Sequence, residues 1–131
     1  METIRIHTNS RTEMIAVTRE LQQLVSEKGW QDGALLVYCP HTTAGLTINE
    51  NADPDVQHDM TRFMNEMVPH EKYFRHMEGN SDAHIKTSLF GPHVMLIVEG
   101  GTIRLGTWQG VYFSEWDGPR SRNLWVQFLK G

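Results

Sequence analysis

The last third of the chain alternates short apolar runs with glycine-containing turns, and this pattern restricts the possible folds more than any other feature. The runs are VMLIV (94–98), TIRL (102–105), VYF (111–113) and LWVQFL (124–129). Gly100-Gly101 separates the first two runs and Asp117-Gly118-Pro119 separates the last two, and both sequences are typical of tight turns. Short apolar runs bounded by turn residues predict β-strands, so we expect this part of the chain to form antiparallel β-structure.

The first half of the chain contains both strand and helix signals. Strands are expected at TIRIH (3–7), ALLVYC (34–39) and LTIN (46–49). The run ALLVYC follows Asp32-Gly33 and ends at Pro40, which favours a buried strand over a short helix. Cys39, the only cysteine, is interpreted as a small buried hydrophobic residue and not as a nucleophile.

The first long helix is predicted over residues 11–28. Ser10 and Glu13 match an S-x-x-E capping box, and Gly29 suits the left-handed position that ends many helices. Between them, apolar residues recur at helical spacing: Met14, Val17, Leu21, Leu24 and Val25. One apolar face of this kind is typical of a helix that packs on a core.

A second long helix is expected to begin at Asp53-Pro54 and to end before Pro69. The Asp side chain can accept a hydrogen bond from a free backbone N–H, and proline at the first helical position has no N–H to satisfy. Its apolar stripe is rich in methionine and consists of Val56, Met60, Phe63, Met64 and Met67. We interpret this stripe as core packing, with a soft binding groove as the alternative.

A third, short helix of about two turns is predicted before Gly91-Pro92, with Asp82 as its N-terminal cap. No repeat, linker or low-complexity segment interrupts the chain. We therefore predict one compact α+β domain over residues 1–131, with antiparallel β-sheets in a sandwich-like arrangement, two long helices and one short helix.

Composition excludes several functional classes. The chain has 131 residues, 39% hydrophobic and 21% charged, which is typical of a globular domain. Its net charge is −4 and it has no run of Lys or Arg, so we expect no nucleic-acid binding. The apolar runs are far shorter than the roughly 20 residues of a membrane helix, so no membrane partner is expected. The N-terminus lacks a signal-peptide pattern, and a single cysteine favours a cytoplasmic location.

The stretch HMEGNSDAH (76–84) is the first candidate site. Imidazole and carboxylate groups bind Zn²⁺ and similar ions, and Gly79 allows the loop to fold back between His76 and His84. If Asp82 caps the short helix, His84 lies in the first turn, where the helix dipole favours the neutral imidazole that a metal requires. The alternative is a polar loop with a helix cap.

The stretch PHTTAGLTINENADPD (40–55) is the second candidate site. A buried strand delivers His41 to its end, and Thr42 and Thr43 supply hydroxyl groups. Strand alternation places Asn49 and Glu50 on opposite faces, so one of them can point inward. Glu50 is then a candidate metal ligand or general acid or base. The alternative is a solvated connection.

The third candidate is RLGTWQGVYFSEW (104–116). Glycines on both sides of Thr107-Trp108-Gln109 suggest a close backbone approach, and Trp108 can stack on a flat ring or pack in the core. Glu115 interrupts an apolar strand and is either exposed at an edge or functional. Arg120 and Arg122 can hold phosphate or lie on the surface as ordinary arginines.

Together these stretches resemble the YjbQ-like family, small proteins described as secondary thiamine-phosphate synthases. The motifs are HTTAGLTINENADPD (41–55), HMEGNSDAHIKTSLFG (76–91) and LGTWQGVYFSE (105–115), and the resemblance covers about residues 3–129. The positions that match the family's motif residues are His41, Glu50, His76, His84 and Trp108. Some members have three more residues between the E-G pair and the last histidine, which bears on the role of Asp82.

The resemblance implies a homotrimer with a metal-associated site and a reaction that joins a pyrimidine pyrophosphate to a thiazole phosphate. The residues assigned on this basis are His41, His76 and His84 for a divalent metal (Zn or Mg), Glu50, Asp82 and His84 for catalysis, and Thr42, Thr43, Trp108, Gln109, Arg120 and Arg122 for substrate binding. The partner is then a small phosphorylated metabolite. The alternatives are metal-assisted hydrolysis of a phosphate or amide, and a trimer that binds a metal or metabolite without catalysis.

Overall fold

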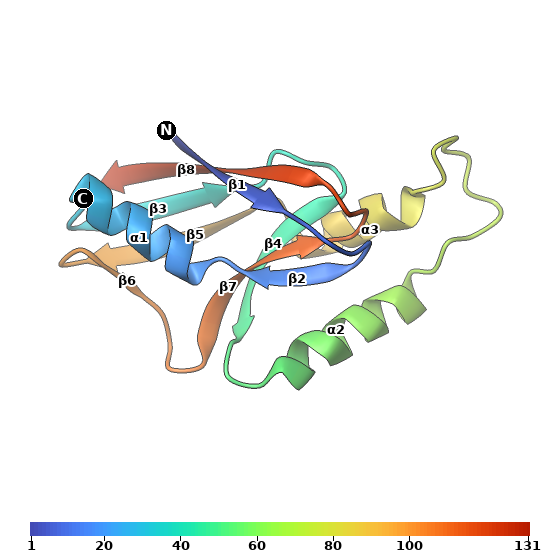
Figure 1. The fold of residues 1–131 in the computed structure, drawn as a ribbon, viewed down its shortest axis with the longest axis horizontal. Helices are drawn as coiled ribbons and strands as arrows, with labels where there is room; N and C mark the ends of the chain where they lie inside the picture. Colours follow the sequence, from blue (N-terminus) through green and yellow to red (C-terminus); the bar gives the residue numbers. More distant parts are fainter.

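The computed structural model describes all residues from 1 to 131 as eight strands and three helices (Figure 1). In chain order they are β1 (Glu2–His7), β2 (Glu13–Ala16), α1 (Thr18–Lys28), β3 (Gly33–Tyr38), β4 (Ala44–Glu50), α2 (Pro54–Met67), α3 (Ser81–Phe90), β5 (His93–Glu99), β6 (Thr102–Arg104), β7 (Gln109–Glu115) and β8 (Ser121–Lys130). A five-stranded sheet has the order β1-β8-β3-β5-β6, and a three-stranded sheet has the order β2-β7-β4. All pairings are antiparallel, which confirms the predicted α+β fold class.

The main hydrophobic core is formed by the inward residues of both sheets and of α1. Alternate residues of β3 and β8 are buried, and β7 is buried along almost its whole length. The largest apolar side chains in this core are Leu21, Leu35, Leu46, Phe113 and Leu124, each at most 1% exposed. Burying one such side chain contributes about 1.5–3 kcal/mol, so this cluster is the main source of stability.

Every strand predicted from the sequence is present. The β5–β6 hairpin turns at Gly100 and Gly101, whose φ angles of 58° and 78° lie in the left-handed region that glycine adopts without strain. Cys39 is buried as predicted, and its thiol donates to the Ala44 carbonyl at 3.2 Å. Burial raises the pKa of this thiol to about 11, which disfavours the reactive thiolate.

The helix predicted over residues 11–28 is wrong at its start. Residues Glu13–Ala16 form strand β2, and α1 begins at Thr18. The Glu13 carboxylate does accept the Ser10 N–H at 3.0 Å, as in a capping box, but this contact shapes a loop. The segment pairs with β7 instead, from Glu13 opposite Glu115 to Ala16 opposite Tyr112. Pairing with a buried strand therefore outweighs the local helical pattern.

Helix α2 begins as predicted, and the Asp53 carboxylate accepts the Asp55 N–H at 2.9 Å. The prediction that the methionine-rich stripe packs in the core is correct for only part of it. Met64 is buried, whereas Phe63 and Met67 are 62% and 49% exposed. In Figure 1, α2 and the loop that follows it extend away from the two sheets at one end of the molecule.

Helix α3 begins at Ser81, with Asn80 at the cap position and no side-chain capping bond. The prediction of Asp82 as the cap is therefore wrong, and Asp82 lies buried in the first turn. Helix α3 packs on β4, which runs from the α3 side of the molecule to the turn before α2 (Figure 1). None of the three helices is long and apolar enough to cross a membrane.

Candidate functional site

His41 and His84 line one open pocket of about 640 Å³, although 43 positions separate them in the sequence. His41 follows the end of β3, and His84 lies on α3. The pocket wall also contains three hydroxyl side chains and two aromatic rings, namely Thr42, Thr87, Ser88, Tyr38 and Trp125. The Tyr38 and Trp125 rings stack at 5.9 Å between centroids. The structure therefore brings two of the three predicted histidines to one site.

The His41 ring is held by the backbone of β8. The Asn123 N–H donates to Nε2 of His41 at 2.9 Å. Because Nε2 accepts this bond, the neutral ring carries its proton on Nδ1. Burial and the nearby Arg122 guanidinium lower the pKa of His41, so the ring is neutral at pH 7.

His76 lies beside His84 but does not line the pocket. The two rings meet edge to face, with centroids 5.4 Å apart, and His76 is exposed on the loop before α3. The chain contains no group of three His, Cys, Asp or Glu side chains arranged to hold a metal ion. Within one chain, His84 contacts His76 and shares a pocket with His41, but the three predicted metal ligands do not form one three-ligand cage.

A buried ion pair lies behind the His41 segment. Arg122 is 4% exposed, Glu115 is fully buried, and the guanidinium donates to both oxygens of the carboxylate. Arg122 also donates to the Thr43 hydroxyl at 2.8 Å, while Thr8 donates to Glu115 at 2.8 Å. Burial alone would raise the pKa of Glu115, but these hydrogen bonds outweigh it and lower that pKa. Arg122 and Thr43 thus position the segment that carries His41 and do not line the pocket.

Arg120 has a different environment from Arg122. Its side chain is half exposed and donates to the Asp117 carbonyl at 2.7 Å and to the Asp117 carboxylate at 2.8 Å. Asp117 also accepts a hydrogen bond from the Asn80 side chain at 2.7 Å. These contacts tie the β7–β8 turn to the start of α3, outside the histidine pocket.

Asp82 faces away from His84. Residues two positions apart on a helix do not share a face. Asp82 accepts hydrogen bonds from Arg11 at 3.2 Å and from Lys86 at 3.1 Å, and Lys86 also donates to Asn65 at 2.8 Å. Burial would raise the pKa of Asp82, but Lys86 and Arg11 outweigh it and lower that pKa. Asp82 therefore borders a separate polar pocket of about 280 Å³.

Glu50, Trp108 and Gln109 lie together at the opposite end of β4. Glu50 is opposite Gln109 in the β4–β7 ladder, and Trp108 is 63% exposed. A strand of seven residues spans roughly 20 Å at about 3.3 Å per residue, which separates this group from His41. The predicted close backbone approach is confirmed at Gly110, where an added Cβ would lie 2.8 Å from the Asn51 side chain.

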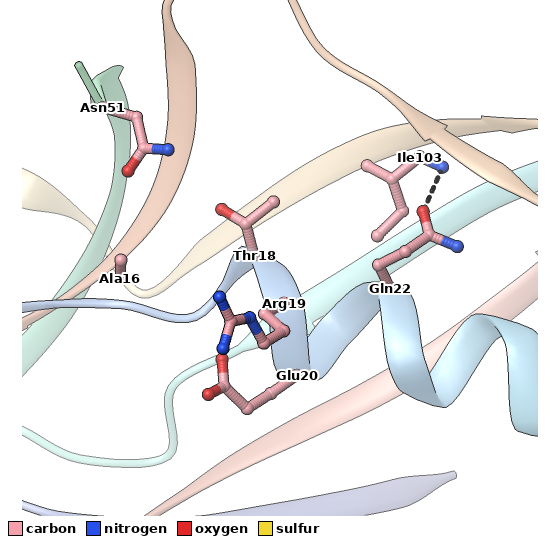
Figure 2. Close-up of a pocket in the computed structure, with 7 residues that line it drawn as sticks. All are labelled: Ala16, Thr18, Arg19, Glu20, Gln22, Asn51 and Ile103. Atoms are coloured by element: carbon pink, nitrogen blue, oxygen red, sulfur yellow. Dashed lines mark hydrogen bonds between the residues drawn. The ribbon is translucent and has the colours of Figure 1, made fainter.

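A further pocket of about 590 Å³ lies near this end of β4, and none of its residues was a predicted site residue (Figure 2). Polar side chains of α1 form much of its wall, and Asn51 lines it from the turn after β4 (Figure 2). Asn51 accepts a hydrogen bond from the Tyr112 hydroxyl at 3.0 Å. Gln22 accepts the Ile103 N–H at 2.9 Å. The pocket therefore borders the Glu50 group but lies apart from the histidines.

Comparison with known proteins identifies the family. A family model described as "UPF0047 protein YjbQ-like" matches residues 2–131. The chain belongs to the YjbQ-like family. Among YjbQ-like relatives, UPF0047 protein YugU of Bacillus subtilis is 52% identical over 98% of each chain. UPF0047 protein MJ1081 of Methanocaldococcus jannaschii is 48% identical over 95% of this chain and 91% of its own length.

Two solved structures have the same fold as this chain. A crystal structure from Clostridium acetobutylicum superimposes with a TM-score of 0.95 at 45% identity and covers 98% of this chain and 100% of that chain. The hypothetical protein APE1520 from Aeropyrum pernix superimposes with a TM-score of 0.93 at 34% identity over both full chains. These matches confirm the predicted resemblance across the whole domain.

Several residues of the site were not predicted from the sequence. Asn123 acts through its backbone N–H, which no side-chain pattern reports. Tyr38 and Trp125 lie within predicted strands, and nothing in the sequence marked them as site residues. The alternation of side chains along β3 and β8 places both on the outer face of the sheet. The pairing of Lys86 with Asp82 could have been predicted from the sequence, because Lys86 lies four residues after Asp82 and is therefore on the same helical face.

Proposed function

We propose that this YjbQ-like protein is a transferase of the thiamine-phosphate synthase type, which joins a pyrimidine pyrophosphate to a thiazole phosphate in the His41–His84 pocket. The observation that supports this proposal is the convergence of two imidazoles, several hydroxyls and two aromatic rings on one open pocket. Polar groups of this kind suit phosphate oxygens, and aromatic rings suit a flat heterocycle. The proposed setting is the cytoplasm.

The chemistry requires that negative charge on the departing pyrophosphate is stabilised. Hydrogen bonds from the pocket hydroxyls and from His41 serve this purpose, because fixed donors cost no reorganisation during the reaction. His84 is the proposed proton donor or acceptor. The Tyr38–Trp125 ring pair replaces Trp108 as the nearest stacking surface for the pyrimidine within one chain.

The proposed divalent metal, Zn²⁺ or Mg²⁺, fits the three histidines only in part. The adjacent rings of His76 and His84 suit two positions of an imidazole site. His41 does not fit, because its Nε2 accepts the Asn123 N–H. An ion bound between His76 and His84 would supply positive charge near the leaving group.

We also propose the homotrimer that the family resemblance implies. The outer face of the five-stranded sheet carries a contiguous group of exposed apolar side chains on β3, β5 and β8, namely Tyr38, Met95, Ile97, Trp125 and Leu129. An exposed apolar patch on neighbouring strands is typical of an interaction surface. Since Glu50 and Trp108 lie at the far end of β4, they can reach a histidine pocket only from a neighbouring copy.

The decisive experiment mixes purified protein with the two thiamine precursors and measures thiamine phosphate. Wild-type protein should form product, and His84→Ala should abolish it. His58→Ala is the matched control, because His58 is an exposed histidine on α2 outside the pocket, and it should leave turnover unchanged. Unchanged turnover in His84→Ala would show that the site is misassigned, and sedimentation as a monomer at micromolar concentration would contradict the trimer.

The contact between His76 and His84 favours one rival function, in which the protein binds a metal or metabolite without catalysis. Tight metal binding with no turnover of any phosphorylated substrate would support this rival. Metal-dependent release of phosphate from a single substrate would instead support a hydrolase.

A further inference from the structure

We infer that His41 donates a fixed hydrogen bond from Nδ1 to an oxyanion in the pocket, such as a phosphate oxygen, and that it is not a metal ligand. The inference builds on the proposed function, because it concerns the same pocket. It assigns different partners to the two histidines there: an anion for His41, and a metal ion or a proton for His84.

The ladder between β3 and β8 ends before it reaches Asn123. Tyr38 is the last residue of β3 and lies opposite Trp125. Continuing this register would place Pro40 opposite Asn123, but the chain leaves the sheet before that point. The Asn123 N–H donates to the His41 ring at 2.9 Å instead. His41 therefore replaces the missing backbone acceptor, and a metal ion on Nε2 would leave Asn123 without one.

The direction of the hydrogen bond at Nε2 of His41 also distinguishes this ring from a metal ligand. A histidine that ligates a metal normally donates its other ring N–H to a carbonyl or carboxylate. His41 has the opposite arrangement, because an N–H group points at its Nε2. The proton is thus on Nδ1, and His41 lines the pocket as a neutral donor. A donor of this kind recognises an anion and repels a cation.

A buried hydroxyl without a hydrogen-bond partner belongs to a residue of the same pocket. Thr87 lines the pocket and is only 7% exposed, yet its Oγ1 has no hydrogen-bond partner. Buried hydroxyls in native proteins are nearly always satisfied by protein, water or ligand. The Oγ1 atom is itself enclosed by protein, so a rotation of the Thr87 side chain toward the pocket would let it donate to an oxyanion near His41. Thr87 comes from α3 and His41 from the end of β3, so the two groups reach the pocket from different elements.

Nuclear magnetic resonance of the intact protein tests the tautomer directly. Protein with ¹⁵N-labelled histidine should show a His41 ring protonated on Nδ1 and unprotonated on Nε2. The signal is assigned by its disappearance in His41→Gln. A proton on Nε2 of His41 in the unliganded protein would overturn the inference.

Calorimetric titrations with inorganic pyrophosphate and, separately, with Zn²⁺ test the division of roles. His41→Ala should weaken pyrophosphate binding about tenfold or more, the loss expected for one hydrogen bond to a charged group. The same variant should leave Zn²⁺ affinity within about twofold, whereas His84→Ala should weaken Zn²⁺ binding and His58→Ala should change neither. Equal loss of Zn²⁺ affinity in His41→Ala and His84→Ala, or pyrophosphate binding that is absent or insensitive to His41→Ala, would overturn the inference.

If His41→Ala does not fold, His41→Gln replaces it in both titrations. A glutamine amide can accept the Asn123 N–H and donate to an anion, but it is a poor metal ligand. It should retain wild-type Zn²⁺ affinity and part of the pyrophosphate affinity, and loss of Zn²⁺ binding would contradict the inference. Both titrations remain measurable when thiamine precursors give no product, so failure of the proposed reaction is distinguishable from failure of this inference.

Discussion

The two ends of β4 carry the two sets of polar motif residues, and they are built in different ways. At the His41 end, a buried ion pair between Arg122 and Glu115 holds the backbone of the motif. At the other end, the Glu50 carboxylate accepts only the Ala52 N–H, and Trp108 is 63% exposed. The first end is a preformed pocket wall supported by the protein interior. The second is an open surface, which suits a group that completes a site on another copy.

The largest expected effect comes from breaking the buried pair at the His41 end. Arg122→Met leaves the Glu115 carboxylate buried without its cation and should destabilise the fold by about 3–5 kcal/mol. The free energy of unfolding from urea titration measures this loss. Arg62→Ala, which removes an exposed pair with Glu66, is the control and should cost less than about 1 kcal/mol. A loss below that of the control would show that Arg122 does not support the segment.

Acid should reduce the free energy of unfolding by less than Arg122→Met does, because a protonated Glu115 side chain still fills the same space beside Arg122. Since the folded pKa of Glu115 is lowered, its stabilising contribution is complete above the ordinary value of 4.5. This contribution is lost as the pH falls below 4.5 and through the folded pKa. Urea titrations at a series of pH values should show a shallower acid loss in Glu115→Gln than in wild type. Identical pH dependence would mean that Glu115 contributes nothing.

Two glycine substitutions compare the packing of the two ends. An added Cβ at Gly45 would lie 2.7 Å from the Gly91 carbonyl, a backbone atom, whereas at Gly110 it would meet the Asn51 side chain at 2.8 Å. A side chain moves more easily than backbone, so Gly45→Ala should cost toward the upper end of about 1–3 kcal/mol and Gly110→Ala toward the lower end. Thermal unfolding of both variants gives the ranking, and the reverse ranking would contradict a more rigid His41 end.

The smallest effect on stability is expected at the open end. Trp108→Ala removes a mostly exposed ring and should change the free energy of unfolding by no more than about 0.5 kcal/mol. If Trp108 completes the pocket of a neighbouring copy, the same variant should still lose turnover. A stable variant with full turnover would exclude Trp108 from the site.

The strands were predictable because apolar runs and turn residues are local signals. The start of α1 was not, because the choice between helix and strand over Glu13–Ala16 depends on pairing with β7, which lies about a hundred positions away. The exposed Phe63 and Met67 show a related limit: periodicity identifies an apolar face but not what covers it.

For the site, the family motifs indicated the histidines, but no spacing rule predicts that His41 and His84 share a pocket. The Arg122–Glu115 pair was also missed as a unit, because an arginine after a turn usually lies on the surface. Asp82 and His84 were both predicted as catalytic residues, yet helical geometry places them on opposite sides of α3.

The stacked Tyr38 and Trp125 rings belong both to the wall of the pocket and to the outer face of the five-stranded sheet. If copies associate through that face as proposed, occupancy of the pocket and association are thermodynamically linked. A small molecule that orders the two rings lowers the entropic cost of docking, and docking raises affinity for the small molecule by the same factor. Apparent affinity should accordingly rise with protein concentration.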